Sequence, residues 1–95
     1  MFKVKETKMM DPKMLLGVVN QKVAGIIPVS LGSEALSNMQ FSIERNGQIE
    51  PVVVYNGMLY DGRHRCMCMR NLGREVEAII VDDEATTEEE VIEYI

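Results

Sequence analysis

The stretch YDGRHRCMCMRNLG, residues 60–73, contains most of the side chains in this 95-residue chain that could do chemistry. An aspartate, a glycine, the chain's one histidine and two arginines directly precede two cysteines. This set fits three kinds of chemistry: a metal site, a redox centre or a cradle for a phosphate group. An ordinary helix start without chemistry is the fourth interpretation.

The two cysteines, Cys66 and Cys68, are separated by one residue. Zinc sites commonly use two cysteines with two to four residues between them, together with two further ligands. On a helix, positions i and i+2 point about 200° apart, so one ion cannot easily hold both thiols. Cysteine is also a small apolar residue that suits a helix core. We therefore predict that both cysteines are structural, and we predict no metal site.

The residues before the cysteines favour an anion. Gly62 lies between an expected strand and an expected helix, whose first N–H groups and dipole attract negative charge. Arg63 and Arg65 fall in the first turn of that helix, where the dipole disfavours cations, unless a negative ligand lies between them. Their forked guanidinium groups and the imidazole of His64 could all donate to phosphate. Asp61 is expected to cap the helix or to hold His64 or an arginine. Alternatively, the arginines pair with acidic residues on a solvated surface.

The pattern of apolar residues predicts the elements that position this loop. Asn56-Gly57 is the preferred pair for a two-residue hairpin turn between two short strands. Asp11 followed by Pro12 is typical of a helix start. In chain order we expect an edge strand over 2–9, a short helix from 12, a helix over 33–46, strands over 52–55 and 58–60, a helix over 63–72, a strand over 75–81 and a final helix capped by Thr86 or Thr87. This order predicts an α+β fold, with a small mixed sheet, a β-hairpin and packed helices.

In the helix over 33–46, an apolar stripe is expected to face the core. Its predicted members are Ala35, Leu36, Met39, Phe41 and Ile43.

Composition limits the possible functions. Ninety-five residues make one domain, spanning 1–95, and 46% are hydrophobic without any run long enough to cross a membrane. The N-terminus lacks the apolar segment of a secretion signal, so we expect a cytoplasmic protein. The net charge is −5, and from Glu75 onward there are nine acids and no base. Because duplex binding depends on neutralising phosphates, we expect DNA to be bound only weakly or through a partner.

From about Val23 to the C-terminus, the chain resembles the N-terminal domain of the ParB/sulfiredoxin family. Three motifs carry the resemblance in the family's order: SIERNGQIEP at 42–51, DGRHR at 61–65 and a helix that closes with Gly73. The variant of the central motif is typical of small phage or mobile-element members. The resemblance implies a ParB/sulfiredoxin-like single domain.

The resemblance also implies roles for individual residues. Partition proteins of this family bind cytidine triphosphate through the central loop, which would place Gly62, His64 and Arg65 on the phosphates. Arg63 stands where those proteins have glutamate, which favours binding over catalysis. Sulfiredoxins have their catalytic cysteine at the same position, so their chemistry is not expected here. Other relatives are serine kinases that use ADP or ATP.

Three polar residues, Arg45, Gln48 and Glu50, lie near the end of the helix over 33–46 and the entry of the first hairpin strand. In the family's fold this region faces the loop, so Gln48 could touch a base or ribose; a polar turn is the alternative.

Together these observations predict a site for a nucleoside di- or triphosphate, CTP or ATP, with Mg²⁺. Its predicted residues are Gln48, Asp61, Gly62, Arg63, His64 and Arg65, and no catalytic residue is assigned. The predicted function is nucleotide binding linked to DNA partition or regulation, with weak hydrolysis or phosphoryl transfer left open. The alternative is a non-catalytic protein-interaction or DNA-associated regulatory module of a phage or plasmid. A protein partner or a homodimer is expected, and a membrane is not.

Overall fold

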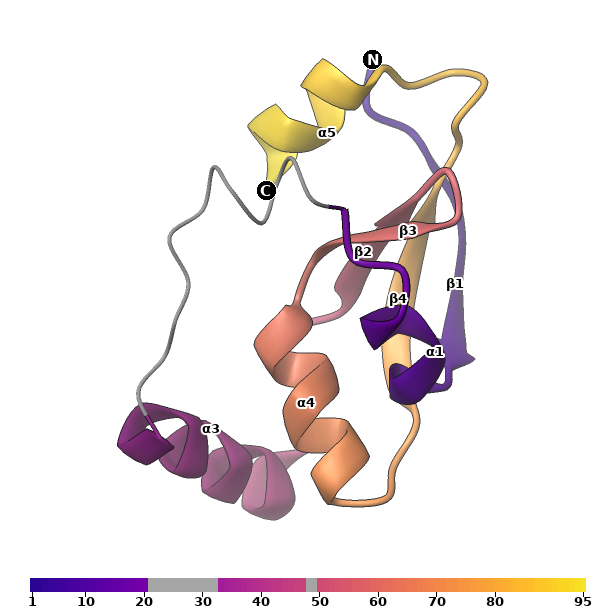
Figure 1. Ribbon diagram of the computed structural model, residues 1–95. Helices are drawn as coiled ribbons and strands as arrows, with labels where there is room; N and C mark the ends of the chain where they lie inside the picture. Colours follow the sequence, from indigo (N-terminus) through magenta and orange to yellow (C-terminus); the bar gives the residue numbers. More distant parts are fainter. Residues whose placement is uncertain (21–32, 48–49) are drawn as a thin grey trace.

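A computed structural model of the chain describes residues 1–20, 33–47 and 50–95. Four strands form one sheet in the order β1-β4-β2-β3. The strands are β1 Val4–Met10, β2 Val52–Tyr55, β3 Met58–Asp61 and β4 Val76–Val81, and the helices are α1 Pro12–Leu16, α3 Ser33–Asn46, α4 Arg63–Asn71 and α5 Glu88–Tyr94. Figure 1 shows α1 and α4 against the sheet, α3 beyond α4, and α5 at one end near both termini. The predicted class and order of elements are confirmed.

The sheet is mixed, as predicted. Strand β4 pairs antiparallel with β1 and parallel with β2, and β2 pairs antiparallel with β3. The hairpin between β2 and β3 turns at Asn56 and Gly57, whose φ angles are +51° and +75°. Positive φ at both central residues is the requirement of a type I′ turn, which matches the right-handed twist of the strands. The Asn-Gly pair therefore fixes the turn locally.

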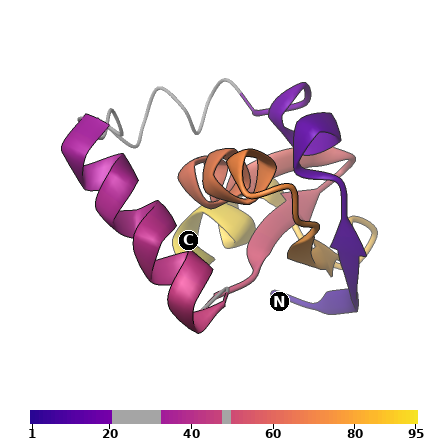
Figure 2. The same ribbon diagram turned by 90° about the horizontal axis from the view of Figure 1, so that it is seen from below.

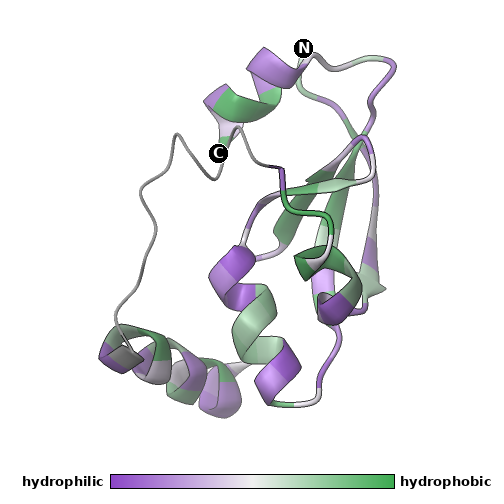
Figure 3. Cartoon of the chain, in the orientation of Figure 1, coloured by the Kyte–Doolittle hydropathy of each residue, from purple (hydrophilic) through white to green (hydrophobic). Residues whose placement is uncertain are grey.

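Two apolar layers cover the two faces of the sheet. One core cluster lies between the sheet and helices α1, α3 and α4, and includes Leu15, Ile43 and Leu59. A second cluster, which includes Val53 and Val91, lies under α5 on the other face. Figure 3 shows the corresponding apolar colouring along the central strands. Because β2 is covered on both faces, its three valines are all buried.

Helix α3 presents a narrower apolar stripe than the sequence suggests. Leu36, Met39 and Ile43 pack on the core. Ala35 is exposed, and the Phe41 side chain is 60% exposed with the Arg45 guanidinium 5.6 Å from its ring centre. Figure 2 shows α3 at the periphery, alongside α4. The prediction was wrong for Ala35 and Phe41, because a helix packed mainly on one other helix buries only the residues along that line of contact.

Both predicted helix starts are confirmed. The Asp11 carboxylate accepts a hydrogen bond from the Lys13 backbone N–H at 2.9 Å, with Pro12 at the first helical position. At α5 the cap is Thr87, which forms a reciprocal capping box with Glu90. Thr86, the other candidate, is buried instead and accepts from the Lys3 backbone N–H at 3.0 Å. No helix among the described residues is long and apolar enough to span a bilayer.

A buried hydrogen-bond chain joins β3 to α5. The Tyr60 hydroxyl donates to the Glu88 carboxylate at 2.9 Å and accepts from the Asn20 amide at 3.1 Å. The Tyr60 side chain is 5% exposed, and its ring contacts that of Tyr55 edge-on. Burial, followed by the hydrogen bond and the charge of Glu88, raises the pKa of Tyr60 to about 12. The neutral phenol is therefore part of what holds α5 to the sheet.

We expect the domain to lose stability as the pH rises from about 10 to 12. Unfolded Tyr60 ionises near pH 10 and folded Tyr60 only near 12, so the unfolded state binds fewer protons in that window. The loss is roughly 2–3 kcal/mol of unfolding free energy. Urea unfolding across this pH range should show the slope in the native chain, a much smaller slope in Tyr60→Phe, and the native slope in Tyr94→Phe, an exposed control. Equal slopes in both variants would assign the alkaline loss to other groups.

Candidate functional site

The candidate loop, Asp61–Arg65, lies where β3 ends and α4 begins. Gly62 occupies the N-cap position with φ +104°, and no side chain caps the helix. The first intrahelical bond runs from the Cys66 N–H to the Gly62 carbonyl at 2.9 Å. The N–H groups that precede it lie at the positive end of the helix dipole. The strand-glycine-helix turn predicted from the sequence is therefore present.

Gly62 is required by packing as well as by its backbone angle. A Cβ at this position would lie 2.3 Å from Cγ1 of Val52, whose side chain is fully buried on β2. It would also lie 3.2 Å from the Arg65 guanidinium. The loop thus passes directly over the core, and this close approach fixes where α4 starts relative to the sheet.

Arg65 attaches the loop to the entry of β2. Its Nη2 group donates to the Pro51 carbonyl at 3.4 Å and to the Asp61 carboxylate at 3.2 Å. Its Nη1 group lies 3.8 Å from the Glu50 carboxylate, and 21% of the side chain is exposed. Two carboxylates therefore already balance much of the guanidinium charge, although Nε is buried without a hydrogen-bond partner in the described structure.

Asp61 holds an arginine and does not cap the helix. Of the roles that the sequence left open for it, the structure shows the ion pair with Arg65, four residues along the chain. The side chain of Asp61 is partly exposed, at 39%. Its negative charge offsets the unfavourable interaction of Arg65 with the dipole of α4. The ion pair explains how a cation is tolerated in this first turn.

Arg63 and His64, like the rest of the loop, are partly exposed. Burial, and then the charge of Arg63, lower the pKa of the His64 imidazole below its ordinary value. The ring is therefore neutral near pH 7, with one nitrogen able to donate and the other able to accept. An anion placed beside it would reverse the effect of Arg63 and favour the imidazolium.

The two cysteines lie inside the core cluster under α4, both with 0% exposure. Burial raises the pKa of the Cys66 thiol to about 11, and it also raises that of Cys68. At neutral pH both are thus protonated, apolar side chains with little nucleophilic character. Within residues 1–20, 33–47 and 50–95, no three metal-ligating side chains form a group that could hold an ion.

The other predicted site residue, Gln48, lies outside the described residues. Of its neighbours, Glu50 reaches the loop through Arg65, whereas Arg45 lies over Phe41 on α3. The expectation that this region faces the loop holds for Glu50, but the contacts of Glu50 and of the Pro51 carbonyl with Arg65 were not predicted. Their position directly before the first hairpin strand was the available signal, since the hairpin brings that point back beside the start of α4.

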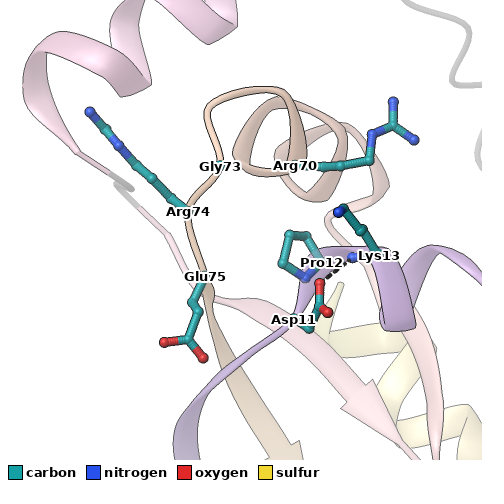
Figure 4. Close-up of a pocket in the computed structure, with 7 residues that line it drawn as sticks. All are labelled: Asp11, Pro12, Lys13, Arg70, Gly73, Arg74 and Glu75. Carbon is teal, nitrogen blue, oxygen red and sulfur yellow. Dashed lines mark hydrogen bonds between the residues drawn. The ribbon is translucent and has the colours of Figure 1, made fainter.

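A surface hollow lies at the opposite end of α4 from the loop. It has a volume of about 300 Å³ and is lined by Asp11, Pro12, Lys13, Arg70, Gly73, Arg74 and Glu75. Figure 4 shows Arg74 directed away from the others toward α3, where its Nη1 donates to the Ile43 carbonyl at 3.4 Å. Charges of both signs line this hollow, and no residue of the predicted site contributes to it.

Comparison with known proteins supports one assignment. No protein-family model matches the chain, and no curated protein matches it. Among solved structures, it is similar to a Pnob8-like ParB-N domain with a TM-score of 0.64. The chain has the ParB-N fold. The likeness covers 86% of this chain and 30% of that one at 20% sequence identity. The predicted resemblance is therefore confirmed for the fold, and the chain spans less than a third of the structure it matches.

The packing of Gly62 predicts a large difference between two glycines of α4. Gly73, just past the helix, has φ +69° but open space where a Cβ would lie. Gly73→Ala should cost about 1–2 kcal/mol, for the left-handed backbone alone. Gly62→Ala adds the overlap with Val52 and should cost at least about 3 kcal/mol, if the chain folds at all. Urea unfolding of both variants measures the difference, and equal costs would show that the close approach to Val52 is not a constraint.

Proposed function

We propose that this ParB-like domain binds a nucleoside di- or triphosphate, CTP or ATP, with Mg²⁺, through its Asp61–Arg65 loop. The observation that carries the proposal is the uncapped start of α4 at a glycine packed on the core, in a chain with the ParB-N fold. Backbone N–H groups at a helix start are preorganised donors for phosphate oxygens. The loop therefore offers donors that need not move to meet the ligand.

The side chains divide into positioning and binding roles under this proposal. Arg65 acts mainly by fixing the loop to Pro51 and Asp61, with its remaining donor capacity facing the ligand. Arg63 and His64 supply charge and hydrogen bonds from the partly exposed side of the helix. Mg²⁺ would join the phosphates and reduce their repulsion from Asp61 and Glu50. The proposal keeps Gln48 as a contact to the base or ribose.

Binding is favoured over chemistry. The family's glutamate position holds Arg63 here, and the cysteines are buried thiols. Hydrolysis or phosphoryl transfer would need a base, and none is assigned. We therefore propose a nucleotide-binding role in DNA partition or regulation, in the cytoplasm of a phage- or plasmid-bearing cell, with a protein partner reading the DNA because the chain itself carries a charge of −5.

A non-catalytic interaction module is the second candidate. Two observations favour it: the carboxylates of Asp61 and Glu50 already partner Arg65, and Phe41 is exposed on the outer side of α3. In this function the loop is only a structural turn and the domain associates with other proteins. Ligand-induced stabilisation separates the two functions.

Nucleotide should stabilise the domain against heat. A ligand at a hundred times its dissociation constant adds about 2.7 kcal/mol, which corresponds to on the order of 10 °C for a domain of this size. Thermal unfolding should be recorded with CTP, ATP, GTP and ADP, with and without Mg²⁺. Arg63→Ala should remove most of the shift, since a charge-assisted contact contributes about 1.5–3 kcal/mol. Arg65→Ala should also remove most of it, because the loop loses its attachment to Pro51 and Asp61.

Arg70→Ala is the matched control, because Arg70 lies on the same helix, is exposed and is distant from Gly62 along α4. Arg74 is less suitable, since it also holds the Ile43 carbonyl. Arg65→Ala will lower stability without ligand, so the comparison uses the ligand-induced shift in each variant. If millimolar nucleotide produces no shift, or if all three variants retain it, the interaction-module function is favoured.

The affinity for nucleotide should acquire a pH dependence from His64. Its pKa is lowered in the free protein, and the phosphates should raise it, so the complex takes up a proton and binding gains as the pH falls through the range near and below 6.5. Titration calorimetry at several pH values would give the dissociation constant of the nucleotide for the native chain and for His64→Gln. The difference between the two pH profiles is the contribution of His64, because protonation of the nucleotide itself affects both proteins equally. Parallel pH profiles would exclude His64 from the site.

A further inference from the structure

The sheet has one covered edge and one open edge within the described residues. At the β3 edge, residues 18–20 run alongside: the Leu59 N–H donates to the Val18 carbonyl and the Asn20 N–H to the Leu59 carbonyl, both at 2.9 Å. At the other edge lies β1, which among the residues that the structure describes pairs only with β4. Its first six residues, Val4 to Met9, are all exposed. The unpaired N–H and C=O groups of such an edge can pair with another strand.

The residues directly opposite Glu6 and Lys8 on β4 carry no charge. Glu6 faces Ile80 on β4, and Lys8 faces Ala78. Glu6 and Lys8 lie on the same face of β1, and their charged groups are 3.5 Å apart with about half of each side chain exposed. A further strand on the outer side could therefore interact with both charges.

Symmetry allows few ways for this strand to pair with a second copy of itself. Two antiparallel strands related by a twofold axis at Thr7 place Glu6 opposite the partner's Lys8, and Lys8 opposite the partner's Glu6. Because side chains alternate between the two faces of a strand, such an axis must pass between two equivalent residues. Axes at Lys5, Glu6 or Lys8 place like charges opposite each other. Only the first arrangement gives two ion pairs, and it adds a Thr–Thr pair at its centre.

We propose that the outer edge of β1 is a self-association surface, where a second copy of this chain pairs antiparallel about Thr7. Charge complementarity indicates that the partner is a second copy. The order Glu6-Thr7-Lys8 places opposite charges against each other when the strand pairs with an antiparallel copy of itself. The lysines and the irregular pairing between Val4 and Glu6 disfavour extended pairing with unrelated strands. The two four-stranded sheets would join into one continuous sheet. Because few residues meet, the dimer is expected to be weak and reversible.

Sedimentation equilibrium of the full chain, from micromolar to millimolar concentration, tests the proposal. The native chain should show a monomer–dimer equilibrium. Glu6→Lys and Lys8→Glu each replace two attractive pairs by two repulsive ones and should weaken the dimer at least about tenfold. Both sites are exposed, so circular dichroism should confirm unchanged folding.

Mixing the two single variants gives the decisive test. An equimolar mixture of the two single variants should associate as well as the native chain, because the two lysines at positions 6 and 8 of one variant then face the two glutamates at positions 8 and 6 of the other. The double exchange Glu6→Lys with Lys8→Glu should also associate. A native chain that stays monomeric at millimolar concentration overturns the proposal. The proposal is also overturned if the single substitutions leave dimerisation unchanged, or if the mixture of the two variants fails to restore it.

Discussion

The contact between Gly62 and Val52 is the constraint on which the arrangement of this domain depends. Val52 is fully buried in the cluster that joins the sheet to helices α1, α3 and α4. The turn from β3 into α4 crosses directly over it, at a distance that leaves no room for a side chain. The same glycine begins α4, directs its first N–H groups outward and sets the position of the helix on the sheet. One residue, Gly62, therefore meets the steric requirement of the core and also forms the backbone of the candidate site.

The hairpin determines which charged groups lie around this turn. Because β2 and β3 are antiparallel neighbours, the entry of β2 returns beside the start of α4. This places Glu50 and the Pro51 carbonyl next to the guanidinium of Arg65. A cation at a helix N-terminus is unfavourable by itself. Here two carboxylates compensate it, and the proposed function gives the contacts to phosphate to Arg63 and His64.

The two faces and the two edges of the sheet have different roles in the structure and in the proposed functions. One face holds the cysteines and the helix that carries the loop, while the other is covered by α5, which the Tyr60 hydroxyl ties down through Glu88. The β3 edge is covered by the chain itself, and the β1 edge carries a self-complementary charge order. Nucleotide binding and self-association would thus use separate parts of the fold, the α4 start and the far edge strand.

The sequence by itself determined the features that depend on interactions between near neighbours. Asn56-Gly57 fixes the hairpin, Asp11 caps α1, and Gly73 ends α4, because each acts on backbone groups a few residues away. The motif at 61–65 pointed to the ParB-N fold before any contact was known. Tertiary structure alone decided that Asp61 holds Arg65 and does not cap a helix, and that Glu50 also pairs with Arg65. It also decided that Phe41 faces outward, and that Thr86 is buried while Thr87 caps α5. Those outcomes depend on which distant segments pack together, and residue spacing along the chain contains no measure of that.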